Sequence, residues 1–140
     1  MVEKKYQALL GDRIFFGGAA DAVEAVMNEK IDVVIDLRVK EPEKVTYNRV
    51  HAPIAEEAER IEASIQHAVD EVLSAYQDGK RVFFHCGGGG GRAGTVAVGT
   101  LIELGQTSTV EEAEQKAKAI REKVNVRESM RKALQNIYEK

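Results

Sequence analysis

The chain of 140 residues holds 23 acidic and 20 basic side chains, for a formal net charge of −3, and 44% of its residues are hydrophobic. These values predict one globular domain over residues 1–140 with a core that needs no disulfides, and the single cysteine excludes an internal disulfide and a cysteine-rich zinc site. The acidic balance argues against nucleic acid or an anionic membrane surface as a partner.

The first half of the chain alternates short apolar runs with turn residues. Gly11 and Asp12 separate two such runs, and a continuous β-branched run near Val33 is typical of a strand buried on both faces. Between these strands, apolar residues at helical spacing predict a helix. In chain order, the predicted elements are strands over 6–10 and 13–16, a helix over 19–29, and strands over 32–37 and 45–51.

The second half is mainly helical. Apolar positions that repeat at three and four predict a long helix before Gly79, Gly105 ends a later one, and Thr109 with Glu112 forms a capping box. In chain order, the predicted elements are a helix over 56–76, a strand over 81–84, and helices over 95–104, 109–123 and 128–138. This alternation predicts an α/β fold whose mainly parallel central sheet is flanked by helices on both faces.

The most informative stretch is residues 85–94, which reads H-C-G-G-G-G-G-R-A-G between a predicted strand and a predicted helix. Five glycines can fold so that successive N–H groups form an anion-binding nest that opens onto a helix N-terminus. Arg92 can bind two oxygens of a phosphate, and the positive field favours the thiolate of Cys86, a nucleophile aimed at phosphorus. A flexible linker would not lie between two buried elements, so we predict a phosphate site. The predicted phosphate-binding residues are Gly87, Gly88, Gly89, Gly90, Gly91 and Arg92.

His85, Cys86, Gly89 and Arg92 also fit the H-C-x-x-G-x-x-R spacing of the cysteine-dependent protein tyrosine phosphatase superfamily. The chain resembles its small dual-specificity-like members, with weaker likeness over segments 13–18, 33–38 and 51–54. The resemblance implies a dual-specificity phosphatase-like fold and hydrolysis of phosphate monoesters through a phosphocysteine intermediate. It assigns attack to Cys86, phosphate binding to Arg92 and the loop, and tuning of the thiol to His85, with no metal and no cofactor.

The general acid departs from the family pattern. The family places an aspartate on a loop before the cysteine, whereas the matching place here holds Glu56 and Glu57. Glu56 falls at the aspartate position and is the predicted catalytic acid, with Glu57 or Asp36 as alternatives. Glutamates in a first helical turn also complement the helix dipole, and Asp36 closes a predicted strand, which favours a structural role.

Two further positions differ from the family. Ala93 replaces the usual serine or threonine, whose hydroxyl helps the sulfur leave, and Thr95 is the next hydroxyl along the chain. We therefore predict slow breakdown of the phosphoenzyme, with a burst of product. Near the C-terminus, Met130 stands where related phosphatases often have a water-positioning glutamine, and Gln135 is expected to face solvent.

Other functions stay open on the sequence. A non-catalytic module of the same fold would bind phosphorylated ligands but turn over poorly, and a rhodanese-like sulfurtransferase would carry a persulfide on Cys86. An arsenate reductase of the related type would need more cysteines than this chain has. The predicted partner is a phosphorylated protein or a small phosphate monoester, and the lack of basic residues within the glycine loop argues against a polyphosphorylated inositide.

The first residues of the chain lack the apolar region of a signal peptide, and no apolar run approaches a membrane span. We therefore expect a monomer in the cytoplasm, with no membrane partner. The reducing conditions of that compartment would keep Cys86 able to attack.

Overall fold

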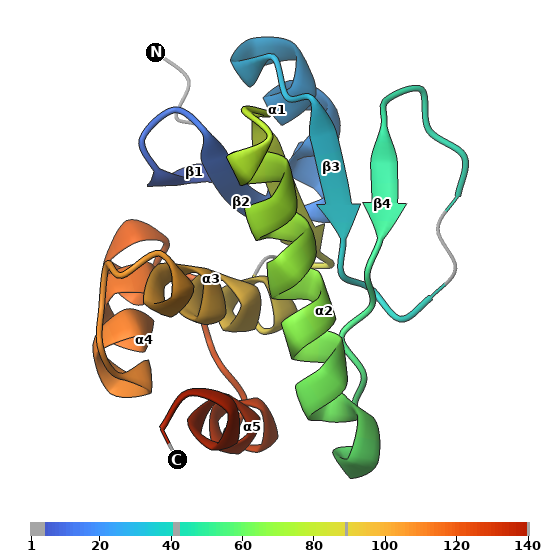
Figure 1. The fold of residues 1–140 in the computed structure, drawn as a ribbon. Coiled ribbons are helices and arrows are strands. Elements are labelled where there is room, and N and C mark those ends of the chain that lie inside the picture. Colours follow the sequence, from blue (N-terminus) through green and yellow to red (C-terminus); the bar gives the residue numbers. More distant parts are fainter. Residues whose placement is uncertain (1–4, 41–42, 89, 140) are drawn as a thin grey trace.

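The computed structural model describes residues 5–40, 43–88 and 90–139. The strands are β1 (Gln7–Leu10), β2 (Ile14–Gly18), β3 (Val33–Asp36), β4 (Arg49–His51) and β5 (Val82–Cys86). They form one sheet of order β1-β2-β5-β3-β4 (Figure 1). Only the edge pair β1–β2 is antiparallel, whereas the other three pairs are parallel, so the predicted mainly parallel sheet is confirmed.

Helices cover both faces of this sheet. They are the short 3-10 helix η1 (Ala19–Asp21) and α1 (Ala22–Glu29), α2 (Ala58–Gln77), α3 (Arg92–Glu103), α4 (Val110–Ile120) and α5 (Glu128–Tyr138). Phe15, Val34 and Phe83 pack against α1 on one face. The residue that follows each of them points to the other face and joins the main core, which α2 and α3 cover (Figure 1).

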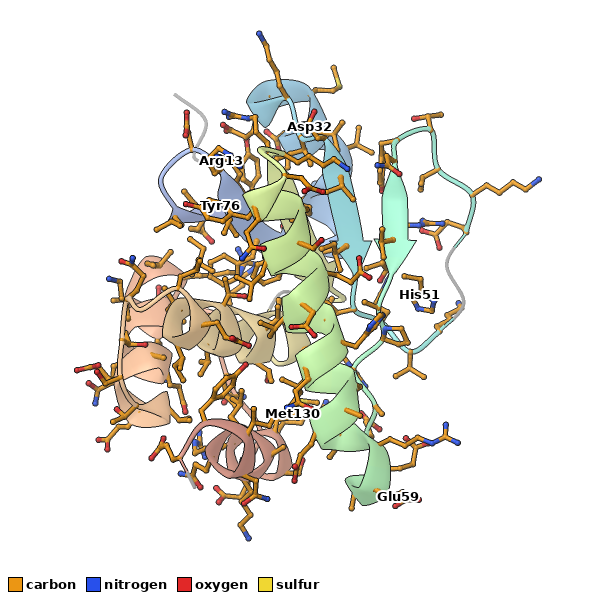
Figure 2. All side chains as sticks on the ribbon, in the orientation of Figure 1. Arg13, Asp32, His51, Glu59, Tyr76 and Met130 are labelled. Atoms are coloured by element: carbon orange, nitrogen blue, oxygen red, sulfur yellow. The ribbon has the colours of Figure 1, made fainter. Side chains whose placement is uncertain are left out.

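The outer helices complete the main core. α4 contacts α3 and the edge strand β1, and α5 contacts α2, α3 and α4. Met130 of α5 is buried between these helices, with its sulfur 3.3 Å from the Thr95 hydroxyl of α3 (Figure 2). No helix in the described ranges is both long and apolar enough to cross a lipid bilayer.

Element boundaries differ from the predictions at a few points. β5 continues through His85 and Cys86, because both pair with β2 and His85 also pairs with Asp36 of β3. α3 begins at Arg92 rather than Thr95, so the arginine opens the helix. α4 ends at Ile120 rather than near 123, because Arg121 is extended and turns into the interior.

Two predicted helix signals are confirmed. The Thr109 hydroxyl accepts the N–H of Glu112 at 3.1 Å, and the Glu112 carboxylate reaches back to the N–H of Ser108 at 2.7 Å. Gly105 takes a φ of +73° just after α3, a conformation that favours glycine. These caps fix where α3 stops and α4 starts, and so place the segment after α4.

Candidate active site

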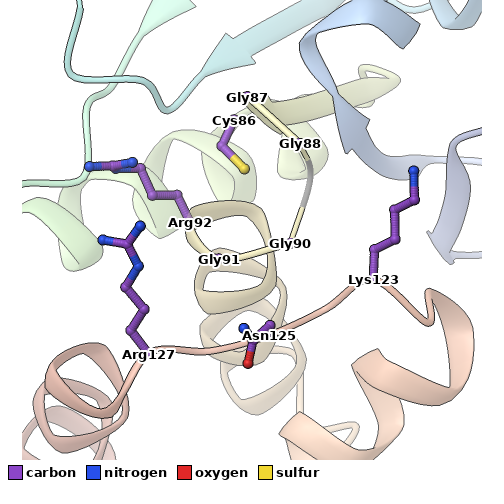
Figure 3. A pocket seen from close by; sticks show the side chains of 9 residues that line it. All are labelled: Cys86, Gly87, Gly88, Gly90, Gly91, Arg92, Lys123, Asn125 and Arg127. Carbon is purple, nitrogen blue, oxygen red and sulfur yellow. The ribbon is translucent and has the colours of Figure 1, made fainter.

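A pocket of about 430 Å³ lies where β5 leads into α3, at the carboxyl ends of the parallel strands. Two stretches of chain line it, the loop after β5 and the segment after α4 (Figure 3). The lining residues are Cys86, Gly87, Gly88, Gly90, Gly91, Arg92, Lys123, Asn125 and Arg127. Predicted residue Gly89 lies outside the described residues, and the other predicted phosphate-binding residues meet here.

The scaffold holds the carbonyl groups of the loop from outside. The Gly87 carbonyl accepts the N–H of Ala19 at 3.0 Å, and the Gly88 carbonyl accepts Nη2 of Arg121 at 3.2 Å. In a trans peptide the C=O and the following N–H point in opposite directions. Holding the Gly87 carbonyl outward therefore turns the N–H of Gly88 toward the pocket, which is the arrangement that an anion requires.

Gly90 is fixed by a close approach of the segment after α4. A Cβ at Gly90 would lie 2.6 Å from the carbonyl oxygen of Lys123, far inside van der Waals contact with backbone. The N–H of Asn125 donates to the Gly90 carbonyl at 3.0 Å. The glycine run thus serves packing as well as anion binding.

The sulfur of Cys86 faces this pocket from the end of β5. The side chain is buried, and the N–H of Ala93, in the first turn of α3, lies 3.5 Å from Sγ. Figure 3 shows the sulfur pointing into the space bounded by the glycine loop and Arg92. The candidate nucleophile therefore lies at the N-terminus of a helix and faces the space that a phosphate would occupy.

Arg92 is held at the rim by two acceptors. Its Nε donates to the Ile54 carbonyl at 3.0 Å, and its Nη2 donates to Oε1 of Glu56 at 2.8 Å. The same Glu56 oxygen accepts Nη1 of Arg127 at 2.9 Å. The predicted acid therefore stands between two guanidinium groups, beside the residue expected to bind phosphate.

The other two acid candidates lie elsewhere. Glu57 is the exposed N-cap residue of α2. Asp36 is fully buried, and Arg38 donates Nε to its Oδ1 at 3.0 Å and Nη2 to its Oδ2 at 2.9 Å. Burial alone would raise the pKa of Asp36, but the hydrogen bonds from Arg38 outweigh it and lower the pKa. This pairing gives Asp36 a structural role.

We expect Asp36→Asn to destabilise the protein by about 3 kcal/mol, because it leaves part of the Arg38 guanidinium without its carboxylate. The pKa of Asp36 is lower in the folded chain than in the unfolded chain. The ionised carboxylate therefore stabilises the fold fully at pH values above the unfolded-state pKa. This stabilisation is lost as the pH falls through the folded-state pKa. Urea unfolding at neutral and acid pH measures this effect. The difference in the free energy of unfolding between wild type and variant should be smaller at acid pH. Activity lost with unchanged unfolding would instead return Asp36 to the acid role.

His85 is buried beneath the loop, as the end of a central strand requires. Its Nδ1 lies 3.1 Å from the carbonyl oxygen of Cys86. Burial lowers the pKa of His85, which favours the neutral ring. His85 therefore contacts the backbone carbonyl of Cys86, next to the candidate site.

The residues at the other family positions are not among the described residues that line the pocket. Ala93 is fully buried, and the Thr95 hydroxyl donates to the Gly91 carbonyl at 2.8 Å. Met130 belongs to the core, and the exposed Gln135 lines a separate surface pocket between α4 and α5.

Sequence reasoning missed the basic side chains that follow α4. Val124 and Val126 are buried, whereas Lys123, Asn125 and Arg127 between and around them are exposed. This alternation is the signature of an extended segment with one buried face, and it was readable in the sequence. Its polar face lines the pocket.

Arg121 was also missed. It is 4% exposed, and it donates to Oε1 of Gln7 at 2.6 Å and to the Gly88 carbonyl at 3.2 Å. Burial lowers the pKa of Arg121. The guanidinium therefore supports the loop from behind. In the described ranges, no cluster of three or more His, Cys, Asp or Glu residues could hold a metal ion.

Comparisons with known proteins agree with this geometry. The family model PTP-SAK, a Swiss Army Knife protein with a DSP-PTPase phosphatase domain, matches residues 19–137. A search of curated proteins found no match.

Solved structures share the fold at low sequence identity. DUSP15 is 16% identical with a TM-score of 0.83, over 98% of this chain and 89% of its own. Tk-PTP in its active form is 21% identical with a TM-score of 0.78, over 99% of each chain. PTPMT1 in complex with PI(5)P is 19% identical with a TM-score of 0.77, over 96% of this chain and 95% of its own. The dual-specificity phosphatase-like fold is therefore confirmed.

Proposed function

This chain belongs to the PTP-SAK family of dual-specificity-like phosphatase domains, and on that premise we propose that it hydrolyses phosphate monoesters through a phosphocysteine intermediate. The observation that carries the proposal is the placement of the Cys86 sulfur. It lies 3.5 Å from the N–H of Ala93, in a pocket that the glycine loop and Arg92 also line. Nucleophile, N–H groups and guanidinium thus surround one space that accommodates a phosphate.

Two steps complete the reaction. First, the Cys86 thiolate attacks phosphorus, the bond to the leaving oxygen breaks, and Glu56 gives its proton to that oxygen. Then water attacks the phosphocysteine, the Glu56 carboxylate takes a proton from the water, and sulfur leaves as thiolate. Arg92 and the loop N–H groups stabilise the charge spread over the other three phosphate oxygens in both steps.

The activity is tested by hydrolysis of p-nitrophenyl phosphate with vanadate as competitor. Acid quenching during turnover should trap a phosphoryl group on Cys86, which peptide mass spectrometry locates. Protein that binds vanadate but releases no p-nitrophenol would be a binding module of the same fold, the second candidate, which Ala93 favours. The matching family model describes a phosphatase domain, which supports hydrolysis over sulfur transfer.

Glu56→Gln tests the acid. Glutamine keeps an oxygen acceptor for Arg92 and Arg127 but has no proton to give. We expect kcat/KM to fall about 100-fold for an alkyl phosphate, whose leaving oxygen needs protonation, and much less for p-nitrophenyl phosphate. The matched control is Glu57→Gln, which removes a neighbouring exposed carboxylate. Equal losses on both substrates would make Glu56 a positioning residue for Arg92 instead.

Ala93→Ser tests the missing hydroxyl. Wild type should show a burst of p-nitrophenol, since attack by Cys86 precedes slower breakdown of the phosphocysteine. One hydrogen bond to the leaving sulfur, worth about 1 kcal/mol, should speed breakdown about fivefold and shrink the burst. Ala97→Ser adds the same hydroxyl one turn further along α3 and serves as control. A wild-type steady-state rate equal to the burst rate would contradict the prediction.

For the natural substrate we propose phosphorylated protein or a small phosphate monoester. The complex of the structurally similar PTPMT1 with PI(5)P supports the small-molecule class. We also propose that the protein acts as a cytoplasmic monomer, since reducing conditions preserve the thiol on which the chemistry depends.

A further inference from the structure

The active-site pocket carries more positive charge than one phosphate requires. Three of its nine described lining residues are cationic, Arg92, Lys123 and Arg127, while none is acidic or aromatic. The whole chain, by contrast, has a net charge of −3. The positive charge is therefore concentrated at this pocket against the overall balance of the chain.

Two of these cations stand apart from the phosphate loop. Lys123 and Arg127 lie at the two ends of one extended segment, and Figure 3 shows them flanking the space that the Cys86 sulfur faces. The buried Val124 and Val126 anchor this segment, and backbone contacts join it to Gly90. The spacing of the two cations is thus set by the fold rather than by long mobile side chains alone.

Both cations are available to a ligand. Among the described residues, no carboxylate lies within ion-pair distance of Lys123. Of the described carboxylates, Arg127 pairs only with Glu56, and the two side chains are 60% and 57% exposed. Exposed pairs of this kind contribute about 0–1 kcal/mol, so an anionic ligand can take the place of Glu56 at little cost.

A single phosphate monoester leaves these two cations unused. Its charge of about −2 is met by Arg92, the loop N–H groups and the start of α3. No aromatic side chain lines the pocket to stack on a phenyl ring. Lys123 would then face solvent, and Arg127 would keep only its exposed pair with Glu56.

We propose that the substrate carries a second anionic group, a phosphate or carboxylate a few bonds from the scissile phosphate, which Lys123 and Arg127 bind. This inference rests on the proposed phosphatase function and names its substrate class. It also changes the expectation drawn from the glycine loop, because the basic residues come from the segment after α4 rather than from within the loop. A free polyanionic metabolite and a phosphorylated lipid headgroup share this chemistry.

A series on one three-carbon scaffold tests the proposal. We would measure kcat/KM for glycerol phosphate, phosphoglycerate and bisphosphoglycerate at fixed ionic strength, with phosphate release as readout. We expect bisphosphoglycerate to exceed glycerol phosphate by about tenfold or more, equivalent to about 1.4 kcal/mol. The double variant Lys123→Ala/Arg127→Ala should reduce that ratio to about the twofold statistical value of two phosphates. Lys116→Ala, which removes an exposed lysine of α4 outside the pocket, is the matched control.

Four further outcomes are decisive. Equal wild-type kcat/KM values for glycerol phosphate and bisphosphoglycerate, or a ratio that persists in the double variant, would overturn the proposal. If no compound, including p-nitrophenyl phosphate, is hydrolysed, the phosphatase function fails instead. Calorimetric binding of the same three compounds then tests the second anion site directly, and equal Kd values would overturn it.

The source of the anion is separated by a last comparison. We would measure kcat/KM for soluble inositol bisphosphate and for phosphatidylinositol phosphate in neutral vesicles. Both substrates are tested with the wild-type protein and with the double variant Lys123→Ala/Arg127→Ala. If the double variant loses more kcat/KM on the soluble compound, the site binds free polyanions. If it loses more kcat/KM on the vesicles, the site binds lipid headgroups. No loss on either overturns the proposal.

Discussion

Cys86→Ser is expected to lower hydrolysis of p-nitrophenyl phosphate by about 10⁴-fold or more, because it removes the nucleophile of the proposed mechanism. A serine hydroxyl keeps its proton at neutral pH, so it is a far weaker nucleophile than a cysteine sulfur. The substitution changes one atom in a buried side chain, so the fold should be preserved. Steady-state rates beside thermal unfolding of both proteins measure the effect.

Phosphate binding supplies the control for this result. Arg92 and the loop are unchanged in the serine variant, so calorimetry should give a Kd for phosphate close to that of the wild-type protein. A variant that still hydrolyses at more than about one-hundredth of the wild-type rate would remove Cys86 from the role of nucleophile. A variant that neither folds nor binds would be replaced by Cys86→Ala, which makes no new hydrogen bond.

The sequence was sufficient to predict that a strand and a helix flank the loop, although not where β5 ends and α3 begins. β5, the glycines and α3 follow from local features: an apolar run, a residue type with unusual backbone freedom, and a buried helix ended by Gly105. Such features depend on neighbours in the chain, so periodicity and turn chemistry predict them. The parallel order of the sheet followed from the alternation of strands and helices in the same way.

Contacts between distant segments were not predictable. Arg121 lies at the end of α4, yet its burial depends on Gln7 and on the Gly88 carbonyl, both far along the chain. The sharing of one Glu56 oxygen by Arg92 and Arg127 likewise joins three separate segments. No periodicity encodes such meetings. The sequence placed Arg121 inside a predicted helix over 109–123 and indicated no role for Arg127.

The glycine run has two roles, of which the sequence predicted one. On the sequence, the uniform glycines accounted for backbone freedom at an anion site. The structure adds that Gly90 leaves no room for a side chain against Lys123. The segment that fills this space also delivers Lys123 and Arg127 to the pocket, so close packing of the loop and the charge of the site have one structural origin.

Arg92→Lys is the conservative change with the largest expected effect after that of the cysteine, a loss of about 10³-fold in kcat/KM. Lysine keeps the charge but presents a single ammonium, so it cannot bind two phosphate oxygens in one plane. It also lacks the Nε group that donates to the Ile54 carbonyl at 3.0 Å and fixes the arginine at the rim. We expect both ground-state binding of phosphate and the rate of attack by Cys86 to fall.

Arg60→Lys, an exposed arginine of α2, is the control for the substitution itself and should leave kcat/KM within about twofold of wild type. Single-turnover rates with p-nitrophenyl phosphate separate the attack from phosphocysteine breakdown, and the loss should appear in the attack. Phosphoryl transfer depends on stabilising the negative charge on the phosphate oxygens. If kcat/KM of the lysine variant were within tenfold of the wild-type value, the loop N–H groups would supply most of that stabilisation. Arg92 would then serve mainly to hold Glu56 at the rim of the pocket, where the two side chains are 2.8 Å apart.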